Sequence, residues 1–321
     1  MADTKDVVAG DPATASDPDK TAWLARIEEV GEDAGYFQTI GNRHWAFFSD
    51  EDPILIVTFE TMQSIRARED GLPMGHAIAR ERGWSSLCLI SDGETWYRDA
   101  AVYRYFDRLV DDAFFEDFDR VVFYGAGMGA YAACAFSVTA PGATVLAVQP
   151  VATLDPAIAG WDRRHLRQRR LSFSDRYGFA PDMTEGAGEV FTFFDPSEPL
   201  DAMHAALFTA PYVTALRCPL LGARIEAALE QMKLLPELIV AAGEGALNAS
   251  HFHRAFRARR RYGPYLRELM SRLDAASRPR LAGLLARNVN TRMQAPRFRQ
   301  RLAELTAQGV QLPPQGKVNP S

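Results

Sequence analysis

Six short runs of β-branched and aromatic residues are the feature that most constrains how this chain folds. They occupy residues 54–60, 86–92, 120–125, 143–150, 189–196 and 212–219. Each run is apolar almost throughout, which is typical of strands covered on both faces. The spacers between them are long enough for helices, as parallel strands require. The pattern predicts an α/β fold with a mostly parallel sheet and helices on both faces.

The composition divides the chain into four segments. Residues 1–20 and 308–321 have few large apolar residues, so we expect two disordered tails. Residues 21–240 carry the strand runs and are predicted to form the α/β domain. The strand runs then end, and residues 241–307 are predicted to form a helical extension rich in arginine.

The predicted extension is strongly basic, whereas the whole chain has a net charge of −5. Residues 251–301 hold fourteen arginines, no lysine and two acids, Glu268 and Asp274. We expect these arginines to cover solvated helix faces and to pair with the acidic remainder or with another subunit. An anionic ligand is a second interpretation. We expect no nucleic acid partner, and the oligomeric state stays open.

The sequence also argues against several protein classes. No stretch reaches the roughly 18 consecutive apolar residues of a membrane-spanning helix, and the first twenty residues lack the apolar run of a secretory signal. We therefore expect a cytoplasmic protein with no membrane span. Cys88, Cys134 and Cys218 lie far apart, so we expect neither a disulfide framework nor a metal site. No cofactor is expected either.

Residues 120–133 combine a predicted buried strand, a glycine-rich turn and a predicted buried helix. Two chemistries use such a turn. In a dinucleotide-binding fold, Gly125, Gly127 and Ala130 form the G-x-G-x-x-G/A fingerprint, with the phosphates over the helix start. In an α/β-hydrolase, Gly125 and Gly129 flank the nucleophile of G-x-S-x-G.

The surroundings of this turn favour the hydrolase. A dinucleotide site needs an acid at the end of the next strand, about 20 residues on. Here that strand ends in Gln149-Pro150. A hydrolase needs an acid after a later strand, and Asp195 ends the run 189–196. A dinucleotide-dependent oxidoreductase stays an alternative.

The turn FYGAGMGAYAA, at residues 123–133, resembles the Y-G-x-S-M-G-G-Y-A-A elbow of α/β-hydrolases, in particular those of bacterial surface-polysaccharide gene sets. In those proteins a Pro tends to end the next strand, as Pro150 does here. D-P and W-D-R-R stretches follow, as at residues 155–156 and 161–164. The resemblance spans residues 50–240, with the elbow its one specific motif. It implies an α/β-hydrolase fold with nucleophile, acid and histidine in that chain order.

Two positions depart from this pattern. Gly127 occupies the place of the serine, and Ala223 stands where the resemblance puts the histidine. Loss of either group removes most of the catalysis of such a triad. Glycine also relieves the strain that a residue with a Cβ bears at an elbow. We therefore expect a catalytically impaired protein, a pseudoenzyme, rather than a Ser-His-Asp hydrolase.

The elbow keeps backbone N–H groups that suit an anionic or carbonyl oxygen. We expect it to bind a small anionic, acyl or glycan ligand, or a protein partner, which the resemblance links to surface polysaccharide. The predicted ligand-binding residues are Gly125, Gly127, Met128, Gly129, Phe59 and Glu60. Residues 93–106, aromatic and charged after a predicted strand, form either a second ligand-facing segment or a packed lid.

One alternative is an active hydrolase or transferase with relocated catalytic groups, Asp195 and His204. His204 lies three residues after Asp201 on a predicted helix, and a structural histidine is the favoured interpretation. A phosphoadenylyl-sulfate reductase is not supported. That chemistry needs a Ser-Gly-Gly-type loop and a reactive cysteine in a Cys-Gly-x-His context, and the sequence has neither.

Overall fold

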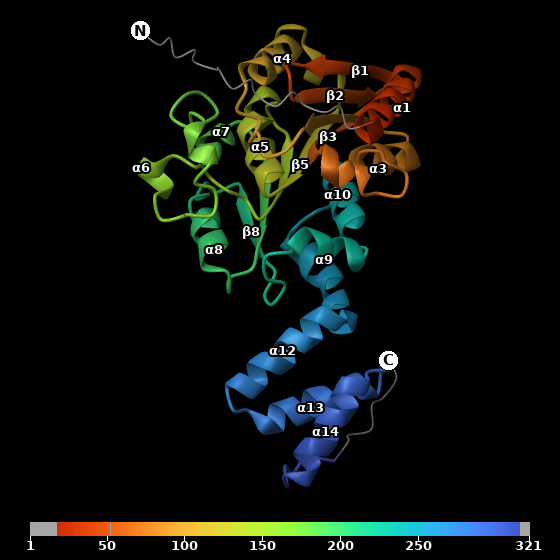
Figure 1. Cartoon of the computed structure of the whole chain (residues 1–321), viewed down its shortest axis with the longest axis vertical. Coiled ribbons are helices and arrows are strands. Elements are labelled where there is room, and N and C mark those ends of the chain that lie inside the picture. Colours follow the sequence, from red (N-terminus) through yellow and green to blue (C-terminus); the bar gives the residue numbers. More distant parts are fainter. Residues whose placement is uncertain (1–17, 52, 315–321) are drawn as a thin grey trace, which may run out of the picture.

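A computed structural model describes residues 18–51 and 53–314 of the 321-residue chain. Its centre is an eight-stranded sheet with the strand order β1-β2-β4-β3-β5-β6-β7-β8 (Figure 1). The strands are β1 Gly35–Ile40, β2 His44–Ser49, β3 Ile54–Thr61, β4 Ser85–Ser91, β5 Arg120–Ala126, β6 Thr144–Val148, β7 Glu189–Phe194 and β8 Val213–Arg217.

The strand directions identify the fold class. Strand β2 pairs antiparallel with both β1 and β4, and every pairing from β4 through β3 to β8 is parallel. This order, with an antiparallel second strand, is that of an α/β-hydrolase-like sheet. The predicted fold class is confirmed, and each of the six apolar runs forms one of the strands β3 to β8.

The chain also forms helices; those up to residue 255 lie around the sheet and cover both of its faces, and those from residue 263 form a separate lobe. They are α1 Pro18–Ala34, α2 Met62–Arg66, α3 Met74–Arg82, α4 Ala100–Asp111, α5 Met128–Phe136, α6 Pro156–Ala159, α7 Ala180–Met183, α8 Pro199–Ala205, α9 Ile225–Gln231, α10 Leu235–Gly243, α11 Ala249–Ala255, α12 Gly263–Ala275, α13 Pro279–Asn290 and α14 Pro296–Ala307. Short 3₁₀ helices span Phe114–Asp117, Ser137–Thr139, Gln168–Arg170 and Phe256–Arg261.

Strand β3 shows why the strand runs are continuously apolar. Leu55 and Val57 pack into the apolar cluster formed with α4 and α5. Ile56, between them, packs into a second cluster formed with α3, α9, α10 and α11. Because successive side chains of a strand point to opposite faces, both sets must be apolar.

The hairpin of β1 and β2 was not predicted. Strand β2 reads HWAFFS and is buried at every position, but it is short and begins with a histidine. Strand β1 lies at the edge of the sheet and is mostly partly exposed. Neither strand therefore carries a long apolar run in the sequence.

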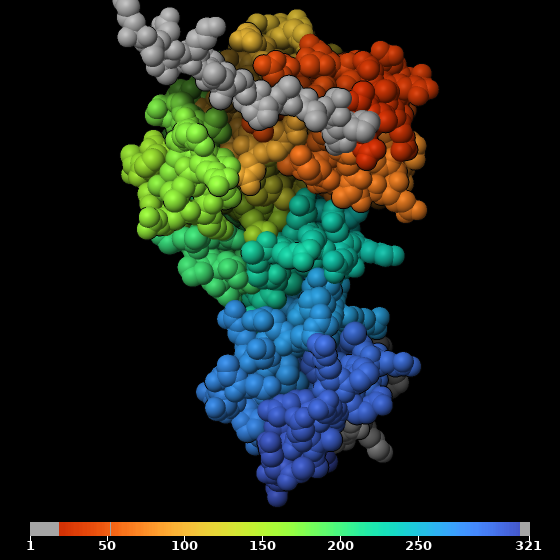
Figure 2. All heavy atoms as spheres, in the orientation of Figure 1, coloured from red at the N-terminus to blue at the C-terminus, as the bar shows by residue number. Residues whose placement is uncertain are grey.

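Helices α12, α13 and α14 form a lobe with its own apolar cluster. Its buried members include Leu266, Met270, Ala286 and Phe298. Figures 1 and 2 show this lobe, in blue, beyond the α/β body and at the opposite end of the molecule from the first helix and strands. The arginines predicted to cover helix faces are mostly exposed, and Arg301 pairs with Asp274 and Glu304.

The predicted division of the chain at residue 241 stays a prediction. Phe252 and Phe256, beyond that residue, are buried in the cluster that covers the sheet. Residues 1–17 and 315–321 of the predicted tails lie outside the described residues. Residues 18–20 begin α1, and residues 308–314 include Val310, which packs against the cluster of the C-terminal lobe.

A membrane-spanning helix needs both sufficient length and an apolar sequence. Within residues 18–51 and 53–314, the helices are too short or too polar to cross a bilayer.

Candidate functional site

The turn after β5 has the backbone conformation of a strained elbow. Gly127 has φ 55° and ψ −113°, and it caps the start of α5. Its N–H donates to the carbonyl oxygen of Val148 at 2.9 Å, which fixes the turn against β6. A Cβ added at Gly127 would meet no heavy atom within 4 Å. A side chain at this position would therefore project into open space.

The glycines on either side of Gly127 are required by packing. A Cβ at Gly125 would overlap the carbonyl oxygen of Gly129. A Cβ at Gly129 would overlap the carbonyl oxygen of Phe59, at the end of β3. These two glycines let α5 start directly over the sheet, as the G-x-S-x-G pattern requires. Gly125 lines neither of the two cavities beside this turn that are described below, so its part in the site is steric.

A cavity of about 350 Å³ lies over the elbow, and we call it the elbow cavity. Its lining comes from the elbow, from the loops after β3, β4 and β8, from helix α8, and from the segment between β6 and β7. The lining residues are Thr61, Glu94, Trp96, Ala126, Gly127, Met128, Gln149, Val151, Arg164, His165, Asp201 and Ala223.

Ala223 and Gly127 face this same cavity. Asp195 is buried just after β7, and its Oδ2 accepts a hydrogen bond of 2.8 Å from the N–H of Gly222. Its Oδ1 accepts from the N–H of Ser197, also at 2.8 Å. The carboxylate therefore holds the loop after β8 at the residue that precedes Ala223.

His204 is engaged elsewhere. Its side chain is fully buried, and its Nδ1 accepts a hydrogen bond of 3.2 Å from the N–H of Ala152. The proton therefore lies on Nε2, which donates to Asp162 at 3.0 Å. Burial lowers the pKa of His204, while the bond to Asp162 acts in the opposite direction. With both ring nitrogens bonded and no position on the elbow cavity, this histidine is placed to orient its neighbours.

Arg164 links the hydrogen-bonded pair of His204 and Asp162 to the elbow cavity. It forms a bidentate pair with Asp162, with Nη2 2.8 Å from Oδ2, and its Nη1 donates to Asp201 at 2.6 Å. Gln149, at the end of β6, donates to the other oxygen of Asp201 at 2.8 Å. Burial alone raises the pKa of Asp162, but the bonds from Arg164 and His204 outweigh it and lower that pKa well below its usual range.

His165 was missed by the sequence analysis. It lines the elbow cavity from the segment between β6 and β7, and its ring packs edge-on against Trp96 with centroids 4.9 Å apart. A single histidine in a loop has no periodic pattern or ligand spacing, so only the fold brings it over Gly127. Trp96 belongs to residues 93–106, for which the sequence predicted either a ligand-facing segment or a packed lid. It lines the cavity.

Three of the eight non-glycine residues with positive φ in the described residues lie at or next to the cavity lining. Trp96, Tyr97 and Gln149 have positive φ values of 54°, 54° and 52°. Positive φ is costly for residues with a Cβ and persists where the surroundings impose it, often at functional sites. The indole N–H of Trp96 is also buried without an acceptor among the described residues. These features identify the elbow cavity as the best candidate site of this chain.

The other predicted ligand-binding residues lie partly in a neighbouring cavity of about 550 Å³. Phe59, Glu60, Met128 and Gly129 line it, and Met128 belongs to both cavities. Its charged lining residues are Glu60, Glu226, Glu230, Arg68 and Arg224. The carboxylate of Glu60 pairs with Arg68 and accepts the N–H of Met74 at 3.0 Å. Three carboxylates against two guanidinium groups make this side a poor place for an anion.

The described residues offer no metal centre. They contain no group of three or more His, Cys, Asp or Glu residues placed to hold an ion. Cys88, Cys134 and Cys218 are free thiols and buried.

Of three comparisons with known proteins, the one with solved structures finds similar folds, and the other two find nothing. No protein-family model matches the chain, and the search of curated proteins gives no match. An esterase from Pyrobaculum calidifontis is 10% identical, with a TM-score of 0.45, over 74% of this chain and 96% of its own. The Gap123 glycosylation-associated protein complex from Streptococcus agalactiae is 14% identical, with a TM-score of 0.46, and the match covers 66% of this chain and 46% of the other chain.

A third likeness is to the capsule O-acetyltransferase of Neisseria meningitidis serogroup A. It is 11% identical, with a TM-score of 0.39, over 61% of this chain and 92% of its own. The fold assignment rests on the strand order and directions given above rather than on these low scores.

Proposed function

We propose that this chain is an α/β-hydrolase-fold protein that binds a small ligand in the elbow cavity without serine-hydrolase catalysis. The observation that carries the proposal is the pairing of Gly127 and Ala223 on one cavity. The elbow geometry is intact at Gly127, yet no hydroxyl is there, and the loop held by Asp195 presents a methyl group instead of an imidazole. Covalent catalysis by a Ser-His pair needs a hydroxyl at residue 127 and an imidazole at residue 223, and this chain has neither.

Two alternatives receive less support. An active enzyme based on Asp195 and His204 needs a histidine that can take a proton, and both nitrogens of His204 are already bonded. A dinucleotide-dependent oxidoreductase is disfavoured by the strand order, which differs from the 3-2-1-4-5-6 order of the dinucleotide-binding fold. The strand after the elbow, β6, is followed by Gln149, which is bonded to Asp201, so no acid lies there for a ribose.

An ester-hydrolysis assay tests the absence of turnover. We expect the natural chain to hydrolyse p-nitrophenyl acetate and butyrate at the background rate. Gly127→Ser alone should do the same, because Ala223 supplies no base. The double variant Gly127→Ser/Ala223→His should hydrolyse the esters measurably, because Asp195 already lies beside residue 222 to orient the new imidazole. Turnover by the natural chain that survives purification to homogeneity contradicts the proposal.

Other features expected from the sequence stay predictions. The link to surface polysaccharide rests on the resemblance of the elbow, and the cytoplasmic location rests on the sequence alone. A protein partner in place of a small ligand also stays a prediction. A thermal-shift assay with NAD, NADP and FAD at millimolar concentration tests the oxidoreductase alternative, for which we expect no stabilisation.

A further inference from the structure

We propose that this chain associates with a second copy of itself, with the arginines of the C-terminal lobe of one copy docked on an acidic, aromatic surface of the other. That surface, which we call the acidic face, consists of Phe48, Asp50, Glu51 and residues 111–119. The inference depends neither on the elbow cavity nor on its ligand.

The C-terminal lobe carries arginines that have no partner within the chain. Residues 251–301 hold fourteen arginines and two acids, a net charge of +12, so the rest of the chain carries −17. The ion pairs that arginines of α12 to α14 form are with acids of the lobe itself. Five more arginines of the lobe are exposed, and their side chains form no ion pair or hydrogen bond among the described residues. They are Arg267, Arg278, Arg280, Arg297 and Arg299.

Helix stability does not explain three of these arginines. Arg278 caps the start of α13, and Arg280 and Arg297 lie in the first turns of α13 and α14. The positive end of the helix dipole lies there, so a positive side chain is unfavourable for the helix itself. These guanidinium groups are therefore better explained by an anionic partner outside the lobe.

The acidic face supplies the complementary charge. Asp111, Asp112, Glu116, Asp117 and Asp119 lie between the end of α4 and the start of β5. All five are exposed, and within residues 18–51 and 53–314 none of them forms an ion pair. A row of carboxylates without basic neighbours is costly for the chain alone and favours a cationic partner.

A cavity of about 460 Å³ in the acidic face suits a guanidinium group. Its lining residues are Phe48, Asp50, Glu51, Pro53, Phe114, Asp117 and Phe118, three carboxylates and three aromatic rings with no basic side chain. The rings of Phe48 and Phe118 both pack T-shaped on Phe114, with centroids 5.3 Å apart in each pair. A guanidinium group stacks on aromatic faces and bonds to carboxylates, so an arginine finds both partners in this one cavity.

The two surfaces lie too far apart to meet within one chain. In Figure 1, α4 and β2, which lead into the acidic face, lie at the end of the body away from the lobe, and Figure 2 shows the lobe projecting from the other end. Each copy presents one surface of each kind. The contact is therefore head-to-tail, between the lobe of one copy and the body of the next.

Sedimentation velocity of the full chain over a range of concentrations tests the association. The chain should form dimers and longer assemblies at about 0.1 M NaCl, where the Debye length is about 10 Å. These should dissociate at about 1 M NaCl, where it is about 3 Å.

Charge reversal tests the two surfaces separately. Arg280→Glu/Arg297→Glu reverses the lobe at positions where a negative charge suits a helix start. Glu51→Lys/Asp117→Lys reverses the lining of the cavity. Each double variant should weaken association about tenfold or more, because like charges then face each other. A chain with all four substitutions should recover most of the lost affinity, because the charges are complementary again.

The matched control is Glu28→Lys/Glu29→Lys, which makes the same change in net charge on exposed residues of α1. Helix α1 packs with Phe47 on one face of the sheet, whereas Phe48 belongs to the cluster on the other face. The control should associate like the natural chain. Circular dichroism shows whether each variant is folded, and Arg280→Gln/Arg297→Gln, which only removes charge, should weaken association in the same direction as the reversal.

The inference is overturned if the natural chain stays monomeric at the lower salt, if either reversal associates like the natural chain, or if the fourfold variant stays as weak as the double variants. A monomeric chain that binds duplex DNA, and loses this binding in Arg280→Glu/Arg297→Glu, would assign the lobe to nucleic acid instead. None of these results bears on the ester-hydrolysis assay, so the proposed function is decided separately.

Discussion

At the scale of single residues, the three glycines of the elbow have different reasons to be glycine. Gly125 and Gly129 lie where a Cβ would overlap a backbone carbonyl oxygen. Gly127 has open space around it, and only its positive φ disfavours a side chain. Packing therefore fixes Gly125 and Gly129 as glycines, whereas Gly127 is a position from which a side chain would have open space to enter.

Alanine substitutions separate these two causes. Gly127→Ala should lower the free energy of unfolding by about 1–3 kcal/mol, the cost of a strained φ. Gly125→Ala should lower it by more than that, because α5 or β5 must move. Urea unfolding followed by circular dichroism measures both. Equal losses for the two variants would contradict the packing explanation.

A second prediction at this scale concerns pH and His44. Its side chain is 1% exposed, and its Nε2 is bonded to Thr95 Oγ1 at 2.8 Å. Burial lowers the pKa of His44 from 6.5 to about 4, with a smaller effect of Arg43 in the same direction and of Asp99 against it. The unfolded chain therefore takes up a proton first as the pH falls.

It follows that the stability associated with a neutral His44 is present above pH 6.5 and is lost between pH 6.5 and about 4. The loss should be about 3 kcal/mol, at 1.36 kcal/mol for each unit of pKa. Unfolding measured at several pH values should show a flatter profile for His44→Gln, and the exposed control His253→Gln should match the natural chain. An unchanged profile in His44→Gln would rule out this histidine as the cause.

The turn after β5 could be predicted from the sequence because its three glycines alternate over five residues, two of them required by packing and Gly127 by its positive φ. The sequence did not predict the contribution of His165 to the site. That residue reaches the cavity through the path of the segment between β6 and β7, which no local pattern encodes. His204 became a candidate because its spacing from Asp201 is visible in the sequence. Its hydrogen bonds to Ala152 and Asp162, which occupy both ring nitrogens, are visible only in the structure.

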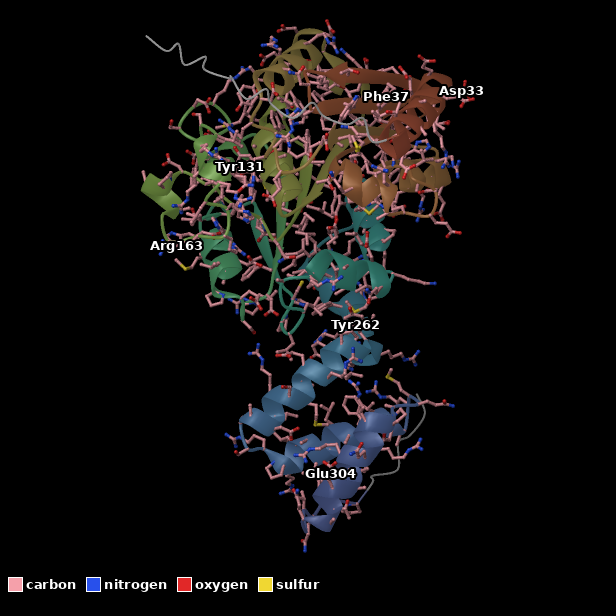
Figure 3. All side chains as sticks on the ribbon, viewed as in Figure 1. Asp33, Phe37, Tyr131, Arg163, Tyr262 and Glu304 are labelled. Carbon is pink, nitrogen blue, oxygen red and sulfur yellow. The ribbon has the colours of Figure 1, made fainter. Side chains whose placement is uncertain are left out.

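At the scale of elements, the segment between β6 and β7 is fixed to the body through Arg98. The guanidinium donates to the carbonyl oxygens of Ser172 and Arg176 at 2.8 and 2.9 Å, and it pairs with Asp175. Only 2% of the Arg98 side chain is exposed. In Figure 3, Tyr131 of α5, which accepts from Arg98, lies beside this segment, while Arg163 lies at its outer edge.

Replacing this arginine should loosen the segment without unfolding the sheet. We expect Arg98→Met to cost about 1–3 kcal/mol, because the carbonyl oxygens of Ser172 and Arg176 lose a charged donor. Hydrogen exchange should quicken in residues 172–177 and stay slow in β5 and β6. The comparison variant Arg176→Met breaks the exposed pair with Asp107 and the contacts of the guanidinium with the rings of Tyr103 and Tyr177, and it should cost less than Arg98→Met. Uniformly faster exchange over the sheet in Arg98→Met would contradict a local role.

Strands β3 to β7 could be predicted because each is covered on both faces and so needs a continuous apolar run, whereas β8 is an edge strand with mostly exposed or partly exposed residues. The hairpin of β1 and β2 could not. Strand β1, at the edge with mixed exposure, has no such requirement, and the pairing of β2 with β4 depends on residues distant in sequence.

At the scale of the whole molecule, the C-terminal lobe packs around its own core. Tyr262 lies at the junction between the lobe and the body (Figure 3), and its hydroxyl donates to Gln231 at 3.0 Å. Phe252, ten residues earlier, is fully buried against Phe193 of β7, with ring centroids 5.5 Å apart. We therefore propose that the body ends close to residue 261 rather than at the change of composition near residue 241.

Truncation tests this boundary. A chain that ends at Arg261 should fold and keep a Tm within a few degrees of the full chain. Phe252→Ala in the full chain should cost about 3–5 kcal/mol, as for other buried phenylalanines. Differential scanning calorimetry measures both. A truncated chain that does not fold would show that the lobe is needed by the body.

The proposed function depends on an elbow that keeps the hydrolase backbone without a nucleophile. Intact-mass spectrometry after treatment with a fluorophosphonate tests this most directly, because the reagent bonds to activated serines. We expect no added mass on the natural chain and one adduct, at residue 127, on Gly127→Ser/Ala223→His. A stoichiometric adduct on any serine of the natural chain would contradict the account.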